Sequence, residues 1–404
     1  MPLREIVDVP SLSFPEDCDA SYVPGLRIGD WVYVSGMTAV DGEGAVVDPA
    51  FEPQVRRTFE NLERTLERAG SSLADVYALT VWLTDMRTLE AFHAVCRDVL
   101  GDARVAMTVV GAGGLLDPEA RVMVEARALA ADAEVECEVV SGAGLADEAH
   151  LPRNVAQAVI VGDLVFVSGQ PGVDERHDLV SVEFDDQMRR VFENVVAALE
   201  AGGSAAEDLV ATTTWMRDHR DRPSFHRRRS EVLGTQVSTS TRVAVPELYH
   251  EESFVAMDAV GVDSAVGKEM VEHPDELPLA TMERDGETYP RFWQSIAAGD
   301  WIFTSGMVGV DAEFRTTSAA FEPQLRKVLE NVEIALESAG ADLRDLVHTR
   351  THLTDMRYAD AFLPVRDEVW GETRATSTIT HSPLLAEKEF RVEVEAIVMR
   401  PERK

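Results

Sequence analysis

Three stretches of the chain share one pattern, a Gly-Asp pair followed by alternating apolar residues and a Ser-Gly ending. They read GDWVYVSGM at Gly29–Met37, GDLVFVSGQ at Gly162–Gln170 and GDWIFTSGM at Gly299–Met307. Alternating apolar residues closed by glycine are typical of a short strand that ends in a turn. The stretches are offset by 133 and 137 residues, which is the size of a small domain rather than of a solenoid repeat.

A helical pattern repeats at the same two offsets. FEPQVRRTFENLERTLERAG begins at Phe51, and its counterparts FDDQMRRVFENVVAALEAGG and FEPQLRKVLENVEIALESAG begin at Phe184 and Phe321. The offsets also relate three later glycines, Gly101, Gly234 and Gly371. Because independent markers share one pair of offsets, the chain is predicted to be three tandem copies of one domain.

Copy one indicates the order of elements within each domain. Val55, Phe59, Leu62 and Leu66 fall at three- and four-residue steps, which predicts an amphipathic helix. VYALTVWLTDM predicts a strand, a second helix ends at Gly101, and MTVVGAG and RVMVEARALA predict two closing strands. The predicted order is β-β-(β)-α-β-α-β-β, an α+β fold in which both helices pack on one face of a mixed sheet.

The helix-free face of each sheet is also apolar and would form a large exposed patch if it stayed bare. We therefore expect the three sheets to pack these faces around a pseudo-threefold axis within one chain. The expected domains are residues 1–133, 134–266 and 267–404, with linkers near 133–153 and 266–290. Such a monomer corresponds to a trimer of single-copy chains, and further dimerisation stays open. Its three interfaces are free to diverge separately.

Composition narrows the class of partner. The 72 acidic and 38 basic residues give a net charge of −34, which disfavours binding to nucleic acid. The three cysteines lie far apart without metal-ligand spacing, and the first twenty residues lack a signal-peptide core. No apolar run reaches the length of a membrane span. We expect a cytoplasmic protein without metal, cofactor, membrane or nucleic-acid contacts that binds a small molecule.

The motifs resemble those of the Rid (YjgF-type) family. The resemblance rests on G-D-x-V-x-V-S-G, Q-x-x-x-x-x-E-N before a helix, T-x-x-x-x-D-M and a closing V-E-x-E-A-type strand, and it covers all three copies. It implies a chorismate-mutase-like fold assembled as a trimeric barrel, with a pocket at each subunit interface. It also implies hydrolysis of reactive imines or enamines, with a substrate-binding Arg, a Glu, a Tyr and an Asn at each site.

Position by position, the copies depart from that pattern. The Tyr position falls on Tyr22, Val155 and Phe292, and the Asn position falls on His93, His226 and Leu363. The Glu position is matched to Glu125, Ala256 and Glu393. Glu125, Glu393, His93 and His226 are therefore the candidate acid/base residues, because Glu in a dry pocket and imidazole can both exchange protons near neutrality. Each of them has an ordinary structural alternative, a solvated strand Glu or a packed His.

The Arg position is matched to Met107, Thr239 and Thr376, so the resemblance places the substrate-binding cation in none of the copies. Arg104 and Arg374 lie two or three residues upstream and would replace it only after a register change. Thr376 and Thr378 point to one face of their strand, as do Thr239 and Thr241, where hydroxyls would bind an uncharged substrate or simply reflect β-propensity. The candidate substrate-binding residues are therefore Tyr22, Phe292, Met107, Thr239, Thr376, Thr378, Arg104 and Arg374.

Three functions stay open at this point. The first is a divergent enzyme that acts on a reactive imine, enamine or amino ketone at an interdomain pocket, by cyclisation, dehydration or hydrolysis in a specialised biosynthetic pathway. The second is a standard 2-imino/enamine acid deaminase. The third is a non-catalytic ligand-binding or scaffold protein.

Overall fold

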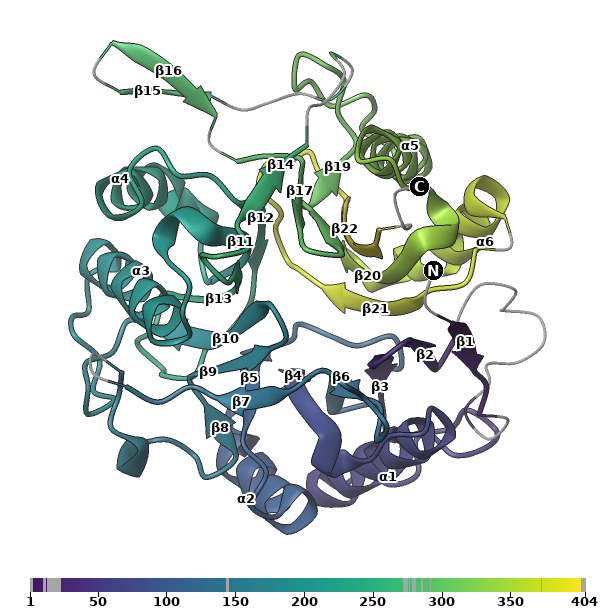
Figure 1. Ribbon diagram of the computed structural model, residues 1–404. Coiled ribbons are helices and arrows are strands. Elements are labelled where there is room, and N and C mark those ends of the chain that lie inside the picture. The colour runs from purple at the N-terminus through teal and green to yellow at the C-terminus, as the bar shows by residue number, and fades with distance from the viewer. Residues whose placement is uncertain are drawn as a thin grey trace.

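The computed structural model describes residues 3–9, 12, 23–142, 145–271, 275, 277, 281–284, 286–290, 292–371 and 373–400. Three mixed sheets surround a common centre, and helices α1–α6 lie on the outside of the ring (Figure 1). This arrangement confirms the predicted α+β fold, in three copies within one chain.

Each copy repeats one set of elements. Copy one contains β2 (Gly25–Ile28), β3 (Trp31–Met37), α1 (Phe51–Arg68), β4 (Val76–Leu83), α2 (Leu89–Leu100), β5 (Val105–Gly111) and β6 (Val122–Leu129). Copy two contains β9 (Ala158–Val161), β10 (Leu164–Pro171), α3 (Phe184–Ala201), β11 (Leu209–Met216), α4 (Arg222–Val232), β12 (Thr239–Ala244) and β13 (Val255–Val262). Copy three contains β17 (Ser295–Ala298), β18 (Trp301–Thr304), β19 (Met307–Val308), α5 (Phe321–Ser338), β20 (Leu346–Leu353), α6 (Ala359–Trp370), β21 (Thr376–His381) and β22 (Val392–Met399).

In each copy, the strand after the first helix and the strand after the second helix, here called the fourth and fifth strands, pair in parallel: β4 with β5, β11 with β12 and β20 with β21. The other core strands pair antiparallel, so the fifth strand lies toward the edge of its sheet. The weak third strand expected from the sequence is only an isolated bridge in each copy, such as Val40 with Val46. Gly101 and Gly371 end α2 and α6 at φ +58° and +60°, a conformation that glycine adopts without strain.

The linkers add strands across the expected domain boundaries. After residue 133, β7 (Cys137–Val139) joins the second sheet, but β8 (Val155–Ala156) returns to the edge of the first sheet beside β5. Outside the repeated elements, β1 (Arg4–Val7) extends the first sheet, β14 (Lys268–Met270) extends the third, and β15 (Thr281–Arg284) pairs with β16 (Glu287–Pro290). The linker after copy one thus contributes to the interface between copies one and two.

The Ser of each Val-Ser-Gly or Thr-Ser-Gly ending joins neighbouring copies. Ser168 Oγ accepts a hydrogen bond from the backbone N–H of Met107 at 2.7 Å. Ser305 accepts from the N–H of Ser240 and Ser35 from that of Ser377, both at 2.9 Å. Copy two therefore packs against copy one, copy three against copy two, and copy one against copy three. These three contacts close the ring as in a cyclic trimer.

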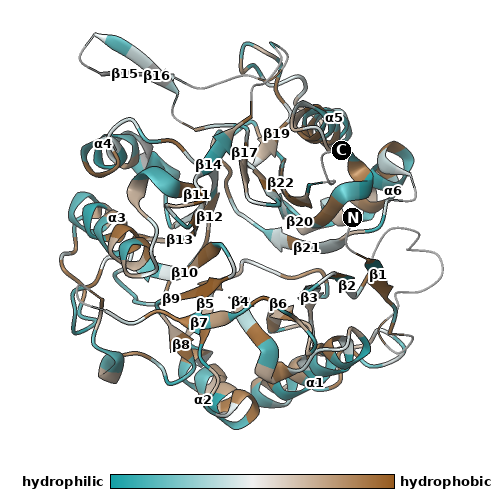
Figure 2. Ribbon diagram, viewed as in Figure 1, coloured by the Kyte–Doolittle hydropathy of each residue, from teal (hydrophilic) through white to brown (hydrophobic). Residues whose placement is uncertain are grey.

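The interior of the ring is built in layers. Parts of the strands around the centre are coloured as hydrophobic in Figure 2, and buried apolar side chains from all three copies meet in the interior. One end is closed by a cluster that includes Trp31, Leu164 and Trp301, and the other by a cluster that includes Trp82 and Trp215. Between these clusters lies a belt of polar side chains, described below. Three further apolar clusters fill the space between each sheet and its two helices.

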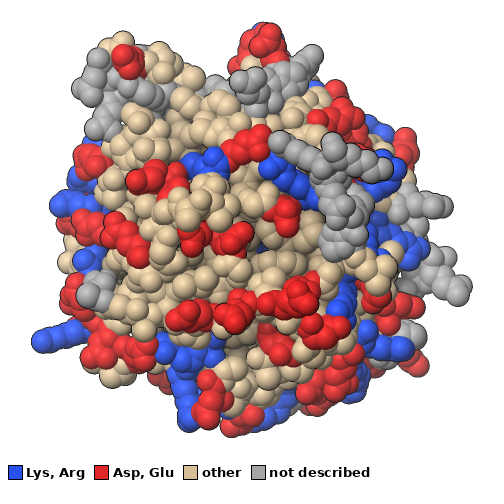
Figure 3. Space-filling model, in the orientation of Figure 1, with Lys and Arg blue, Asp and Glu red and all other residues tan. Residues whose placement is uncertain are grey.

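Acidic side chains are spread across the visible face of the molecule, with basic ones among them, in keeping with the net charge of −34 (Figure 3). Within the described part of the chain, no helix combines the length and the apolar character needed to cross a bilayer.

Candidate functional site

The structure shows which copies face each other. The fifth strand and second helix of one copy meet the Tyr and Glu positions of the next copy. His93 of copy one therefore faces Val155 and Ala256 of copy two, all three around one pocket. Phe292 of copy three lies in a second pocket, on the side that faces copy two. Tyr22 lies outside the described residues.

The strand pairings correct the match at the Arg position. Ala106, Thr239 and Thr376 pair with equivalent residues of the fourth strands, so the counterpart of the two threonines is Ala106. Met107 instead corresponds to Ser240 and Ser377. No copy carries the substrate-binding Arg after this correction either, because alanine is uncharged like the threonines.

The match at the Glu position needs a larger correction. Met123, Ala256 and Glu393 occupy one position, opposite Trp82, Trp215 and His352. Glu125 occupies the next inward-facing position, whose counterparts are Asp258 and Glu395. A slip of two residues keeps a side chain on the same face of its strand, so alternation alone could not separate the two assignments.

Glu125 belongs to the polar belt at the centre of the ring. Its two carboxylate oxygens accept from Arg350 Nη2 at 2.8 Å and Nε at 3.2 Å. Arg350 also donates to Glu395 at 2.8 Å, and His348 Nε2 lies 3.2 Å from Glu125. Burial alone would raise the pKa of Glu125, but Arg350 and His348 hold it well below its usual range. Glu125 is thus a structural anion that joins copies one and three, not an acid at neutral pH.

The threonines predicted to bind substrate are engaged within the protein. Thr239 Oγ1 donates to Val210 O at 3.2 Å, and Thr376 Oγ1 donates to Val347 O at 2.9 Å. Thr378 Oγ1 accepts from the N–H of Gly36 across the junction between copies three and one. These hydroxyls stabilise the strand edges where copies meet.

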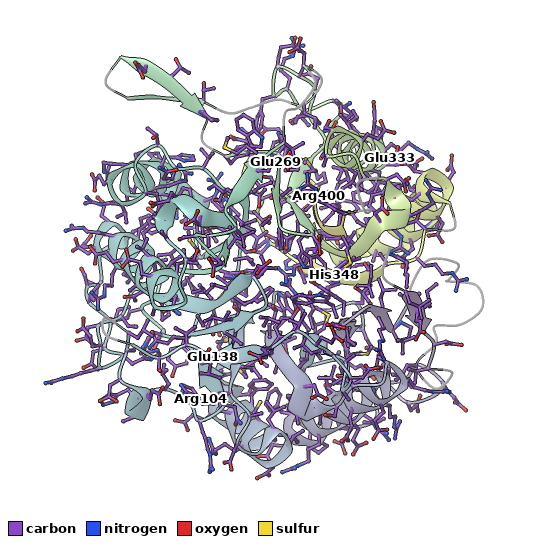
Figure 4. The ribbon with its side chains drawn as sticks, in the orientation of Figure 1. Arg104, Glu138, Glu269, Glu333, His348 and Arg400 are labelled. Atoms are coloured by element: carbon purple, nitrogen blue, oxygen red, sulfur yellow. The ribbon has the colours of Figure 1, made fainter. Side chains whose placement is uncertain are left out.

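The upstream arginines, Arg104 and Arg374, line neither of the two pockets described below. Arg104 is ion-paired with Glu148 at 2.8 Å and donates to Val155 O, so it ties the linker to copy one near the periphery, far from His348 at the centre (Figure 4). Arg374 is exposed on the surface, where its carbonyl accepts from Arg4.

A pocket between copies one and two, named pocket A, has about 800 Å³ of space, part of it open to solvent. Copy one contributes α2 and β5, the linker contributes Leu151 and Pro152, and copy two contributes β10 and neighbouring loops. Its lining is mainly apolar, which is typical of a small-molecule site. The polar side chains that matter most below are His93, Gln157 and Gln170.

A smaller pocket of about 290 Å³, named pocket B, lies on copy three where it faces copy two. Pocket B is the counterpart of pocket A, because most of its lining residues follow those of pocket A by 137 positions. The matched pairs are Val155 and Phe292, Gln157 and Gln294, Gly169 and Gly306, Gln170 and Met307, Pro171 and Val308, Val173 and Val310, His177 and Phe314, and Asn194 and Asn331.

The two pockets differ in size and in a few of their matched residues. Phenylalanines occupy pocket B at Phe292 and Phe314, where pocket A has Val155 and His177. Ala256 lines pocket A at the position that Glu393 holds beside pocket B. Pocket A therefore carries smaller side chains than pocket B at Val155 and Ala256, and copy one and the linker also line it. At the third junction, Met123 takes this position and lies against Gly36.

His93 lies in the wall of pocket A with 8% of its surface exposed. Neither ring nitrogen has a hydrogen-bond partner among the described residues. Burial, with a smaller effect of Arg97, lowers the pKa of His93 to about 4, so the imidazole is neutral at physiological pH. By contrast, His226 and Leu363 line neither pocket A nor pocket B, and Leu363 packs against the core of copy three.

Glu393 is buried at the junction of copies two and three. A Cβ on Gly306 would lie 1.9 Å from its Oε1, so only glycine fits there. Burial raises the pKa of Glu393 to about 8, against the opposing charge of Arg242. Its Oε2 has no hydrogen-bond partner among the described residues. Glu393 is thus a neutral carboxylic acid at pH 7.

The raised pKa of Glu393 makes stability depend on pH. The folded protein binds this proton more tightly than the unfolded chain, where the pKa is 4.5. The stabilisation is complete below pH 4.5 and is lost as the pH rises to about 8. We expect the unfolding free energy of the wild type to fall across this window relative to E393Q, measured by urea denaturation at several pH values. Parallel curves for the two proteins would contradict the buried neutral acid.

Among the described residues, no three His, Cys, Asp or Glu side chains are grouped so that they could hold a metal ion.

Comparison with known proteins places the chain in a family. The protein-family model described as Endoribonuclease L-PSP matches residues 16–142, 151–260 and 285–400. A RutC family protein of Pyrococcus abyssi is 29% identical over 121 residues, 30% of this chain and 84% of that protein. The mitochondrial protein mmf2 of Schizosaccharomyces pombe is 34% identical over 105 residues, 26% of this chain and 82% of that protein. A 2-iminobutanoate/2-iminopropanoate deaminase of Dermatophagoides farinae is 31% identical over 94 residues, 23% of this chain and 73% of that protein.

One solved structure extends beyond a single copy. The crystal structure of a chorismatase is 14% identical, covers 80% of this chain and 93% of that one, and superposes with a TM-score of 0.54, which shows a shared fold. The single-copy relatives each match about one third of the chain or less, as three tandem copies require. The chain therefore belongs to the Endoribonuclease L-PSP (Rid/YjgF) family, with three copies in one polypeptide that correspond to the family trimer.

Proposed function

We propose that the chain is an enzyme that acts on an uncharged, largely apolar imine, enamine or amino ketone in pocket A, without a cofactor, in a specialised biosynthetic pathway. The supporting observation is the contrast between two equivalent pockets. Pocket A has about 800 Å³ of space and is lined by copies one and two, whereas pocket B has about 290 Å³ and carries phenylalanines at two matched positions, Phe292 and Phe314.

The charges around pocket A favour an uncharged substrate. Ala106, which stands at the position of the carboxylate-binding Arg, is uncharged and does not line pocket A. The lining cation Arg190 is already engaged with Glu175 at 2.7 Å and with Val173 O at 2.9 Å. An anionic substrate would therefore lose its hydration without gaining a free cation, which is a large cost in an apolar site.

The polar groups of pocket A suit a planar nitrogen. Gln170 Nε2 donates to Gln157 O at 3.3 Å, and Gln157 Nε2 donates to Ala146 O at 2.9 Å, so both amides are fixed. Their Oε1 atoms remain available to accept an N–H of the substrate. Neutral His93 takes a proton from a water that adds to the imine carbon, or from the carbon beside the imine during tautomerisation to the enamine, and this proton then passes to the nitrogen. In the hydrolysis, the C–N bond of the resulting carbinolamine then breaks and ammonia leaves.

Filling pocket A tests this proposal. V155F installs the residue that copy three carries at the matched position, Phe292. We expect kcat/KM to fall about 100-fold, because the substrate is displaced from its reactive position. The assay follows loss of the imine that an amine oxidase releases from 2-phenylethylamine. The reverse variant F292V, in pocket B, is the matched control and should retain the wild-type rate. Equal rates for V155F and wild type would contradict the proposal.

A standard imino acid deaminase is the second candidate, and Glu393 favours it as a neutral acid beside pocket B whose Oε2 has no partner in the described part of the chain. That candidate predicts rapid loss of 2-iminopropionate and its abolition by E393Q. Our proposal predicts no acceleration with this anionic substrate. If 2-phenylethylamine-derived imine binds in pocket A but is not turned over, the chain is a ligand-binding protein.

A further inference from the structure

The polar belt at the centre of the ring has three acids at matched positions but a single arginine opposite them. The acids lie on the last strands and are Glu125, Asp258 and Glu395. The residues that pair with them on the fourth strands are Thr80, Thr213 and Arg350. Arg350 donates to Glu125 and to Glu395, each at 2.8 Å, so one arginine serves the acids of copies one and three.

Asp258, the acid of copy two, has no cation of its own. In the described part of the chain, its carboxylate forms no ion pair and accepts one hydrogen bond, from Trp215 Nε1 to Oδ2 at 2.6 Å. Burial raises the pKa of Asp258 to about 6, against the opposing charge of Arg350, so the group is mainly ionised at pH 7. A buried carboxylate without a paired cation is costly, which favours a cation beside Oδ1.

Asp258 lines a cavity at the centre of the ring that has about 400 Å³ of space, part of it open to solvent. Arg127 lines this cavity too, but its guanidinium lies 3.8 Å from Glu125 Oε1 and over two aromatic rings. The belt and the cavity together hold three carboxylates and two guanidiniums, which leaves one negative charge. His348, beside Glu125, adds to this balance only when it is protonated.

Thr108 brings an unused hydroxyl to the same cavity. It lies on β5, is 5% exposed and also lines pocket A. The matched hydroxyls of the other copies are engaged, because Thr241 donates to Glu395 and Thr378 accepts from the N–H of Gly36. Thr108 Oγ1 has no hydrogen-bond partner among the residues that the structure describes. A buried hydroxyl of this kind can accept an N–H from a ligand.

We propose that the central cavity binds a small primary alkylammonium ion. Its N–H groups donate to Asp258 Oδ1 and Thr108 Oγ1, and its single positive charge balances the belt. Its alkyl group packs against the largely aliphatic remainder of the lining, which includes Ala106, Val167 and Val260. An alkylammonium fits this lining better than Ca²⁺ or Mg²⁺, which take about six or more oxygen ligands.

Titration of the full chain with ethylammonium chloride tests the site, at pH 8 and at an ionic strength held constant with sodium chloride. We expect saturable binding by isothermal titration calorimetry and a saturable rise in Tm. Tetramethylammonium, which has the charge but no N–H, should bind about tenfold more weakly or less.

D258N and T108V remove the charge and the hydroxyl separately. Asparagine keeps an oxygen that can accept from Trp215 Nε1, so D258N should fold and should weaken ethylammonium binding about tenfold or more. T108V removes a hydroxyl that bonds nothing in the fold and should weaken binding about tenfold. T378V, the matched control at another junction, should leave the affinity within about twofold.

An ethylammonium affinity that D258N leaves unchanged would overturn the proposal, as would equal binding of tetramethylammonium or the absence of saturable binding. V155F separates this site from pocket A, because it should slow imine turnover and leave the ethylammonium affinity intact. Loss of ethylammonium binding in V155F would place the amine in pocket A and contradict a central site.

Discussion

H93L is expected to lower kcat/KM for the imine derived from 2-phenylethylamine by about 10²–10⁴-fold, the usual contribution of a positioned general base. His93 lines pocket A with both ring nitrogens unpartnered among the described residues, so its replacement breaks no hydrogen bond of the fold. Initial rates at low substrate concentration measure the effect. The matched control is H226L, which changes the equivalent residue of copy two and should retain the wild-type rate.

The pH profile gives an independent check on His93. Its pKa is lowered to about 4, and a general base must be unprotonated, so kcat/KM should stay level from neutral pH downward and fall only as the pH approaches 4. An acidic limb near the ordinary histidine pKa of 6.5 would contradict this assignment, as would equal losses in H93L and H226L.

E125L is expected to destabilise the protein by up to about 3–5 kcal/mol, the cost of breaking a buried ion pair, because Arg350 keeps only Glu395 as a carboxylate partner. Glu125 and Arg350 are 2% and 4% exposed and join copy one to copy three through two hydrogen bonds. Urea denaturation followed by tryptophan fluorescence measures the loss, because Trp82 lies under the Arg350 guanidinium.

A double-mutant cycle isolates the pair. E125L/R350M should cost less than the sum of the single variants, although Glu395 then loses its Arg350 partner and part of the loss remains. Additive losses would show that the two residues are not coupled. Folded E125L should keep its imine turnover within about tenfold, because Glu125 lies outside pocket A.

Much of the fold is predictable from the offsets of 133 and 137 residues, since repeated strand, helix and glycine signals are local in sequence. The helices at Phe51–Arg68 and Leu89–Leu100 and the parallel fourth and fifth strands follow from apolar periodicity and element order. The linker strand β8 was not predicted, because two residues that pair with a distant edge carry no periodic signal.

The site was harder to predict than the fold, because some of its residues were matched between copies in the wrong register along their strands. In copy three, both Glu393 and Glu395 face inward, while copy one has only Glu125, which could be matched to either. The offsets themselves decide the question, since they relate Glu125 to Asp258 and Glu395. This signal was present in the sequence and assigns Met123 to the position of Glu393.

Other parts of the site depend on packing between copies. The alternating threonines on β12 and β21 looked free to bind substrate, but neighbouring strands and the next copy use their hydroxyls. Pocket A could not be predicted either, since it forms only when the second helix of copy one, the linker and copy two come together. The sequence shows alanine at position 256, where copy three has Glu393. Whether this alanine widens a pocket depends on which copy it faces, and the sequence does not give that.

The most direct test of the central claim is a crystal structure of the protein soaked with benzamide, an uncharged planar analogue, beside an equal soak with benzoate. We predict benzamide density in pocket A, within hydrogen-bond distance of His93 or Gln170, and no benzoate there. Benzamide absent from pocket A, or benzoate bound beside Glu393 in pocket B, would contradict the account.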